Sequence, residues 1–173
     1  MHVNYKKTAK FLFLILTSVI IAAVSAETYR YMYIDGSITV GSAKMIWALG
    51  ADAPAGSSVS GSEATVDMSV EQGTPVNFTE CLFLKNDNAT GQFSLNITVS
   101  TAVLGADFTK AQMHIYQNSS TNWVYVDTID LTNSTDIYSG TLNAQNFLRM
   151  TFEVEATTGA SGNKPFDIEV VYK

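Results

Sequence analysis

The sequence predicts an all-β protein: two packed sheets in a jelly-roll-like sandwich, preceded by a short N-terminal arm. Apolar and polar residues alternate with a period of two in several segments, most clearly at 93–99 and 166–172. This alternation places one face of a strand on a core and the other face in water. The segments are rich in β-branched and aromatic residues, which favour strands. Clusters of Gly, Asn, Asp and Ser separate them at fairly even spacing, as expected for a sandwich.

Ten strands are expected along the chain. They cover residues 29–34, 37–49 (with a break near Gly41), 64–70, 76–85, 92–101, 111–117, 123–131, 137–142, 147–156 and 166–172. Turn-forming residues at 86–91 predict a hairpin between the fourth strand and the fifth. Longer loops are expected at 50–62 and 157–163, and one short helical turn within 101–110.

Residues 1–26 have the pattern of a cleaved export signal. An apolar run at 11–23 is followed by small residues at 24–26, which offer a cleavage site before Glu27. The basic residues ahead of the run are Lys6, Lys7 and Lys10. The run is shorter than the roughly 20 residues that a membrane-spanning helix needs. Two alternatives stay open: a retained transmembrane helix, and a type IV pilin-like leader cut before the apolar run. Cleavage before Glu27 would make the protein secreted and extracellular.

The chain that remains after cleavage is an acidic chain of one-domain size. It has 147 residues (173 − 26), enough for one domain with a core. No linker interrupts the strand pattern, so we expect an arm at 27–36 and a single sandwich domain at 37–173. Loss of three lysines with the signal changes the net charge from −6 to −9 (7 − 16). An acidic chain without a basic patch argues against nucleic acid and anionic lipid as partners.

Residues that carry chemistry are sparse. His114 is the one histidine after residue 26, and no His or Cys cluster is present. The sequence therefore predicts no metal site, no cofactor and no enzyme activity. Calcium at the loop carboxylates stays open as an alternative; those carboxylates are Asp87, Asp107 and Asp136. Cys81 is the single cysteine and lies in an apolar segment, which favours a core residue over a bridge between subunits.

Five sequons predict N-linked glycosylation. The acceptor residues are Asn77, Asn88, Asn96, Asn118 and Asn133. Asn96 lies between two apolar neighbours, Leu95 and Ile97, so the alternation predicts that its side chain points away from the core. A sugar coat would make an extracellular surface more soluble and better protected.

The N-terminal arm is apolar on both faces. Tyrosines at 29, 31 and 33 alternate with Arg30, Met32 and Ile34. Such a strand belongs in the interior of a sheet or in a groove. One interpretation is insertion into a neighbouring subunit, with 35–37 as a hinge; the other is the first strand of the chain's own sandwich. The expected donor residues are Glu27, Thr28, Tyr29, Arg30, Tyr31, Met32, Tyr33 and Ile34.

The layout resembles the TasA/camelysin-like family, especially archaeal bundling-pilin and thread subunits. The segments that carry the resemblance are Gly-Ser-Ile-Thr-Val at 36–40, Gly-Thr-Pro-Val at 73–76, Glu-Cys-Leu-Phe-Leu-Lys-Asn at 80–86, Asn-Ile-Thr-Val at 96–99 and Phe-Asp-Ile-Glu-Val at 166–170. The resemblance implies a jelly roll and filaments built by donor-strand complementation, with the new N-terminus as donor. It also implies a place in the extracellular matrix or biofilm. The metalloprotease activity linked to the camelysin branch is not carried over, because no metal-ligand motif is present.

These features together predict a secreted, glycosylated structural subunit of a cell-surface filament, such as a pilus or biofilm fibre. Its partner would be itself, in a head-to-tail polymer with possible lateral bundles and a role in adhesion. The alternative is an extracellular carbohydrate- or ligand-binding module that uses exposed aromatic residues, for which Trp47, Trp123 and Tyr125 are the candidates.

Overall fold

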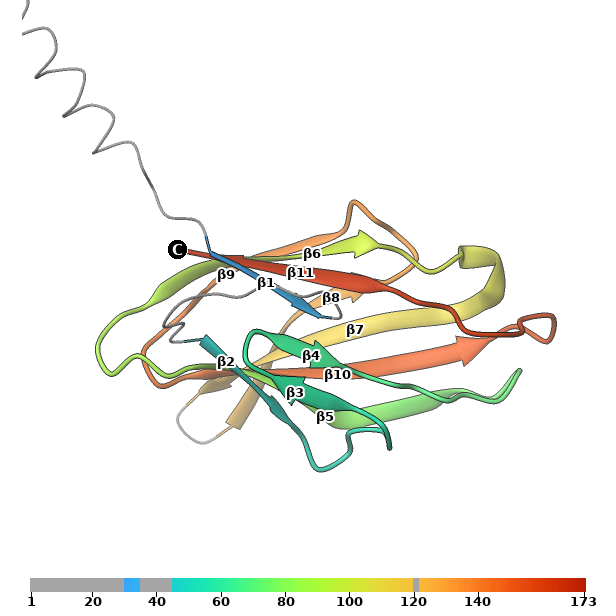
Figure 1. Ribbon diagram of the computed structural model, residues 1–173, viewed down its shortest axis with the longest axis horizontal. Helices are drawn as coiled ribbons and strands as arrows, with labels where there is room; N and C mark the ends of the chain where they lie inside the picture. Colours follow the sequence, from blue (N-terminus) through green and yellow to red (C-terminus); the bar gives the residue numbers. More distant parts are fainter. Residues whose placement is uncertain (1–29, 35–44, 120–121) are drawn as a thin grey trace, which may run out of the picture.

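The computed structural model describes residues 30–34, 45–119 and 122–173, with the backbone alone for 30–34 (Figure 1). These residues form eleven strands and one short 3-10 turn, η1 (Gly105–Asp107). The strands are β1 (Arg30–Ile34), β2 (Met45–Leu49), β3 (Ser58–Ser60), β4 (Glu63–Thr65), β5 (Val76–Asn86), β6 (Phe93–Thr101), β7 (Phe108–Ser119), β8 (Asn122–Asp130), β9 (Ile137–Leu142), β10 (Phe147–Ala156) and β11 (Asp167–Tyr172). The predicted export signal lies outside the described residues.

The strands form two sheets packed face to face, which confirms the all-β sandwich. The six-stranded sheet has the order β3-β4-β1-β11-β6-β9, and the five-stranded sheet has the order β2-β5-β10-β7-β8. Most connections from β5 onward cross from one sheet to the other. The orders β1-β11-β6-β9 and β5-β10-β7-β8 are those of an eight-stranded jelly roll. β2 extends one sheet of this jelly roll, and β3 with β4 extends the other.

The core lies between the sheets and is built by two-residue alternation. In β10 the buried residues are Leu148, Met150, Phe152 and Val154. Residues of β6 and β11 with the same alternation face them from the other sheet. Phe147, at the start of β10, is half-buried on the opposite face, under the ammonium group of Lys85. The strict alternation of β10 assigns the inner position to Leu148 instead.

The predicted hairpin at 76–101 is wrong, because β5 and β6 belong to different sheets. The turn between them is a crossover held by the fully buried side chain of Asn86. Its Nδ2 donates to the carbonyl oxygens of Gly91 (2.9 Å) and Leu142 (3.0 Å), and its Oδ1 accepts the N–H of Asn88 (2.9 Å). These bonds satisfy a buried amide and fix the crossover at the end of β9.

Other predicted elements are confirmed in part. The short helical turn is present as η1, whereas β3 lies within a stretch that was predicted to be a loop. Of the strand predicted at 37–49, the described part is β2. The strand predicted at 64–70 is hydrogen-bonded only as far as Thr65. Residues 66–70 remain extended and alternate between half-buried and exposed positions, but they belong to no strand.

Candidate functional site

β1 occupies an interior position of the six-stranded sheet. It pairs antiparallel with β11 along its whole length, from Arg30 opposite Tyr172 to Ile34 opposite Ile168. On its other side it pairs parallel with β4 over two residues only. Figure 1 shows β1 (blue) beside β11 (red). Here the strand belongs to its own chain, which is the second of the two arrangements left open by the sequence. The other predicted donor residues, at 27–29, lie outside the described residues.

A cavity of about 720 Å³ continues the line of β1. β1 ends where Ile34 faces Ala64 on one side and Ile168 on the other. The cavity begins at the next positions, with residues 65–70 along one wall and 160–166 along the other. Its floor is formed by the apolar side chains of Val103, Phe108, Ala111, Leu131 and Val154. The cavity therefore has the place and the apolar floor of a longer strand in this sheet.

The two walls lack backbone partners within the part of the chain that the structure describes. Among the described residues, neither 66–70 nor 161–166 makes a backbone-to-backbone hydrogen bond. Half-buried Val66, Met68 and Val70 pack against the core while the residues between them are exposed, as in a strand that lacks its neighbour. The far end is closed by Gln72, whose side chain donates to the carbonyl of Ala160. The six residues at 65–70 span about 20 Å at the rise of an extended strand.

A second candidate surface lies on the outer face of the five-stranded sheet. Phe83 pairs with Arg149, Arg149 with Tyr116, and Tyr116 with Tyr125, so that these four side chains form one row across four strands. A bulge in β8 creates this row: Thr128 faces His114 and Tyr125 faces Tyr116, although positions 128 and 125 differ in parity. The extra residue moves Trp123 and Tyr125 to the face of β8 that carries Thr128.

We call Phe83, Tyr116, Trp123, Tyr125 and Arg149 the aromatic platform. The guanidinium of Arg149 lies 4.7 Å from the ring centroid of Tyr116 and 4.8 Å from that of Trp123. Trp123 also packs at 5.7 Å on Phe83, and Tyr125 packs edge-on at 5.7 Å on Tyr116. The outer rings remain accessible, since Trp123 is 36% and Tyr125 is 54% exposed.

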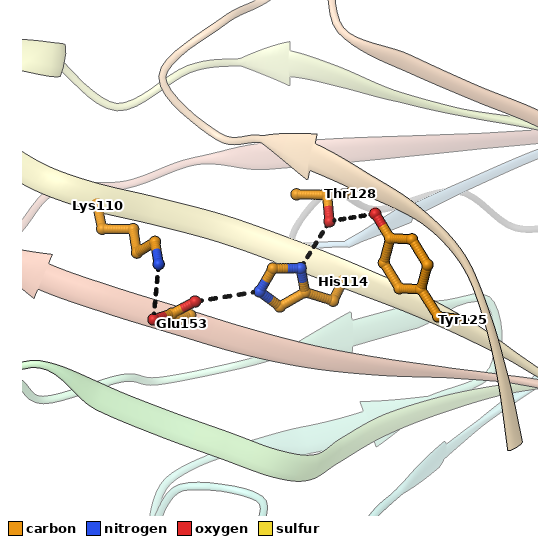
Figure 2. A network of polar contacts seen from close by, with 5 residues as sticks. All are labelled: Lys110, His114, Tyr125, Thr128 and Glu153. Carbon is orange, nitrogen blue, oxygen red and sulfur yellow. Dashed lines mark hydrogen bonds and ion pairs between the residues drawn. The ribbon is translucent and has the colours of Figure 1, made fainter.

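A polar network adjoins the platform (Figure 2). It joins Lys110, Glu153, His114, Thr128 and Tyr125 on β7, β8 and β10. His114 Nε2 lies 3.3 Å from Glu153 Oε2, and Lys110 Nζ lies 2.8 Å from Glu153 Oε1. His114 Nδ1 lies 2.6 Å from Thr128 Oγ1, which lies 2.9 Å from the hydroxyl of Tyr125.

Glu153 fixes the direction of the bonds that end on it. A carboxylate only accepts, so Nε2 of His114 and Nζ of Lys110 donate to it. Thr128 Oγ1 joins Nδ1 of His114 to the hydroxyl of Tyr125. The hydrogen bond from Lys110 holds the pKa of Glu153 below its ordinary value, and the contact with His114 acts in the same direction. The Thr128 hydroxyl bonds to both His114 and Tyr125, so the network positions the Tyr125 ring.

Sequence reasoning missed this network. It treated His114 as an isolated strand residue, because Thr128 and Glu153 are 14 and 39 residues away in sequence. Pairing of β7 with both β8 and β10 brings the three side chains together. The period-two spacing shows which residues share a face of one strand. The sequence does not show which strands are neighbours in the sheet, so it could not bring these three side chains together.

The predicted glycosylation sites divide into two groups. Asn77, Asn96 and Asn133 are exposed, and the outward position predicted for Asn96 is confirmed. Asn88 and Asn118 are half-buried. The side-chain oxygen of Asn118 accepts the N–H of Phe147 at 2.6 Å, which ties this sequon to the start of β10.

Other residues from the sequence analysis have structural positions. Cys81 is fully buried, as predicted for a core residue, and burial raises the pKa of its thiol to about 12. The choice of Trp47 as an exposed aromatic residue is wrong, because Trp47 is buried and its Nε1 donates to the carbonyl of Ser62 at 3.0 Å.

The loop carboxylates have protein partners. Asp87 pairs with Lys85, Asp107 pairs with Lys164, and Asp136 accepts the N–H of Asp130. Among the described residues, no three His, Cys, Asp or Glu side chains are grouped so as to hold a metal ion. The part of the chain described by the structure contains no helix long and apolar enough to cross a membrane.

Fold and sites together define a jelly-roll sandwich with a strand-like cavity in one sheet and an aromatic platform on the other. No protein-family model matches this chain, and no curated protein is significantly similar to it.

Proposed function

We propose that this chain is an exported structural subunit that polymerises into an extracellular filament by exchange of its N-terminal strand. The donor is the arm at 27–34, and the acceptor is the position of β1; the cavity continues this position beyond Ile34, where it would take the donor residues that follow the arm. The protein is secreted after cleavage of residues 1–26 and carries sugars at exposed sequons. Its partner is a second copy of the same chain.

The observation that carries this proposal is the cavity of about 720 Å³ in line with β1. Among the described residues, β1 alone lies between β4 and β11, and its pairing with β4 covers two residues. A donor that continues past Ile34 would also find an apolar floor and the backbone of 66–70, which has no backbone partner among those residues. Backbone hydrogen bonds and side-chain pockets of this kind are the basis of strand addition. Head-to-tail repetition of such a contact produces a filament.

Cysteine cross-linking tests the source of the strand. Tyr31 and Val171 are directly opposite each other in the register of β1 and β11, so Tyr31→Cys with Val171→Cys places two thiols within bridging range. Cys81 does not interfere, because it is fully buried. In protein lacking residues 1–26, we expect oxidation under assembly conditions to give a ladder of covalent multimers that reduction removes.

The matched control is Tyr31→Cys with Ile137→Cys, since β9 is separated from β1 by β11 and β6. It should give no ladder. Electron microscopy should show filaments from protein that begins at Glu27, and only monomers after deletion of 27–36. Intrachain bridges alone, with monodisperse particles in both preparations, would mean that β1 stays paired within its own chain. That result would refute the proposal.

A further inference from the structure

The exposed rings of the aromatic platform are held in fixed positions by contacts with neighbouring side chains. Each accessible ring is fixed by a neighbour: Trp123 by Phe83 and Arg149, and Tyr125 by Tyr116. The hydroxyl of Tyr125 is bonded to Thr128, and the network continues to His114 and Glu153 (Figure 2). The rings lose little conformational entropy when a ligand covers them, because they are already ordered.

The charges around the platform are paired. Arg149 lies 3.8 Å from Glu80, Lys110 lies 2.8 Å from Glu153, and Lys85 lies 2.6 Å from Asp87. These pairs leave no free cation beside the platform, among the described residues, to attract an anionic ligand. Charged residues are depleted at the centre of protein interfaces, whereas Arg149 lies within the aromatic platform and Lys110 and Glu153 lie beside it. A neutral ligand with many hydroxyl groups suits this surface better than a second protein or a polyanion.

The shape of the site indicates an extended ligand. None of the platform side chains lines the cavity. The row crosses β5, β10, β7 and β8 on an outer sheet face, whereas compact small molecules bind in concave pockets. Lys110 and Glu153 keep hydrogen-bonding capacity beyond the bonds they make with each other and with His114. A ligand that stacks on the rings would therefore find polar partners along the same face.

We propose that the aromatic platform binds a linear, neutral polysaccharide. Sugar rings stack through their C–H faces on Trp123 and Tyr125, and their hydroxyl groups bond to the polar side chains that flank them. This site is on the sheet opposite to β1, so it does not depend on which chain supplies that strand.

Affinity electrophoresis tests the proposal with protein lacking residues 1–26. Native gels contain hydroxyethyl cellulose, galactomannan, soluble starch or glycol chitosan acetylated to neutrality, with polygalacturonate as the charged comparison. We expect retardation by at least one neutral polymer and none by polygalacturonate. Tryptophan emission provides a second readout, because Trp47 is buried and a change on addition of oligosaccharide reports on Trp123.

Variants on β8 locate the binding surface. Trp123→Ala should weaken binding about tenfold or more, Tyr125→Ala should weaken it as well, and Trp123→Phe should retain part of it. Val124→Ala is the matched control: Val124 is 50% exposed, lies between the two rings and pairs with Gln117 rather than with a platform residue. It should bind like the parent protein.

Three outcomes would overturn the proposal. They are the absence of retardation by every neutral polymer, binding that survives Trp123→Ala, and preference for polygalacturonate. Light scattering after size exclusion identifies the competing occupant: dimers that Trp123→Ala dissociates, without sugar binding, would assign the platform to a second copy of this chain.

Discussion

The carboxylate of Glu153 lies on the outer face of the five-stranded sheet and has two partners. Lys110 and His114 both contact it, and its pKa is lowered chiefly by the hydrogen bond from Lys110. A carboxylate whose pKa is lower in the folded protein than in the unfolded chain stabilises the fold above its unfolded pKa of about 4.3. That contribution is lost as the pH falls through the folded-state pKa.

Glu153→Gln is therefore expected to lower the free energy of unfolding at pH 7 and to have little effect at the acid end of the range. Urea unfolding at pH 7, 5 and 3 measures the difference between variant and parent, which should shrink as the pH falls. Glu155→Gln is the control, because Glu155 is on the same strand and the same side without an ion pair among the described residues. A pH-independent difference at Glu153 would contradict the ionic origin of the effect.

At the scale of elements, the sequence predicts strands well where one face is buried. The alternation at 93–99 and 147–156 corresponds to β6 and β10, within a few residues at each end. The sequence does not predict which strands pair. Asn86 is of a residue type common in turns, yet its side chain is buried and holds the crossover of the chain to the other sheet. The β8 bulge is equally hidden, because its effect on Trp123 and Tyr125 exists only relative to β7.

The segment at 66–70 has the alternation of a strand but, among the described residues, no backbone-to-backbone hydrogen bonds. Amide exchange in this segment therefore tests whether the cavity is a free acceptor for a strand. In the monomer we expect amides of Val66, Met68 and Val70 to exchange with solvent at least about 100-fold faster than those of Met150 and Phe152 in β10. Hydrogen exchange with mass spectrometry measures both. In assembled material the amides at 66–70 that face the inserted strand should become protected.

Protection of 66–70 in the monomer itself would show that the segment already has a backbone partner, and the cavity would then not be a free acceptor. The N–H of Asp67 is an internal reference, since it donates to the side chain of Ser57 at 3.2 Å and should exchange more slowly than its neighbours.

At the scale of the whole molecule, both sheets contribute to a single core. Buried residues of every strand from β2 to β11 except β3 form one continuous cluster that includes Cys81. Among the described residues no disulfide is present, so packing must stabilise the sandwich. Because Cys81 is fully buried within that cluster, its thiol should become accessible only when the sandwich opens.

Thiol labelling then measures the cooperativity of the sandwich. With burial raising the pKa of Cys81 to about 12, we expect almost no reaction with iodoacetamide at pH 8 in native buffer, and fast reaction in concentrated urea. The fraction labelled in short pulses at increasing urea should follow the same transition as tryptophan emission, as a two-state fold requires. Ile137→Cys adds a thiol at a 47% exposed position and should label at once in native buffer, while Cys81 in the same chain stays unmodified. Labelling of Cys81 at urea concentrations that leave the emission unchanged would mean that β5 opens before the rest of the core, and the two sheets would then not unfold as one unit.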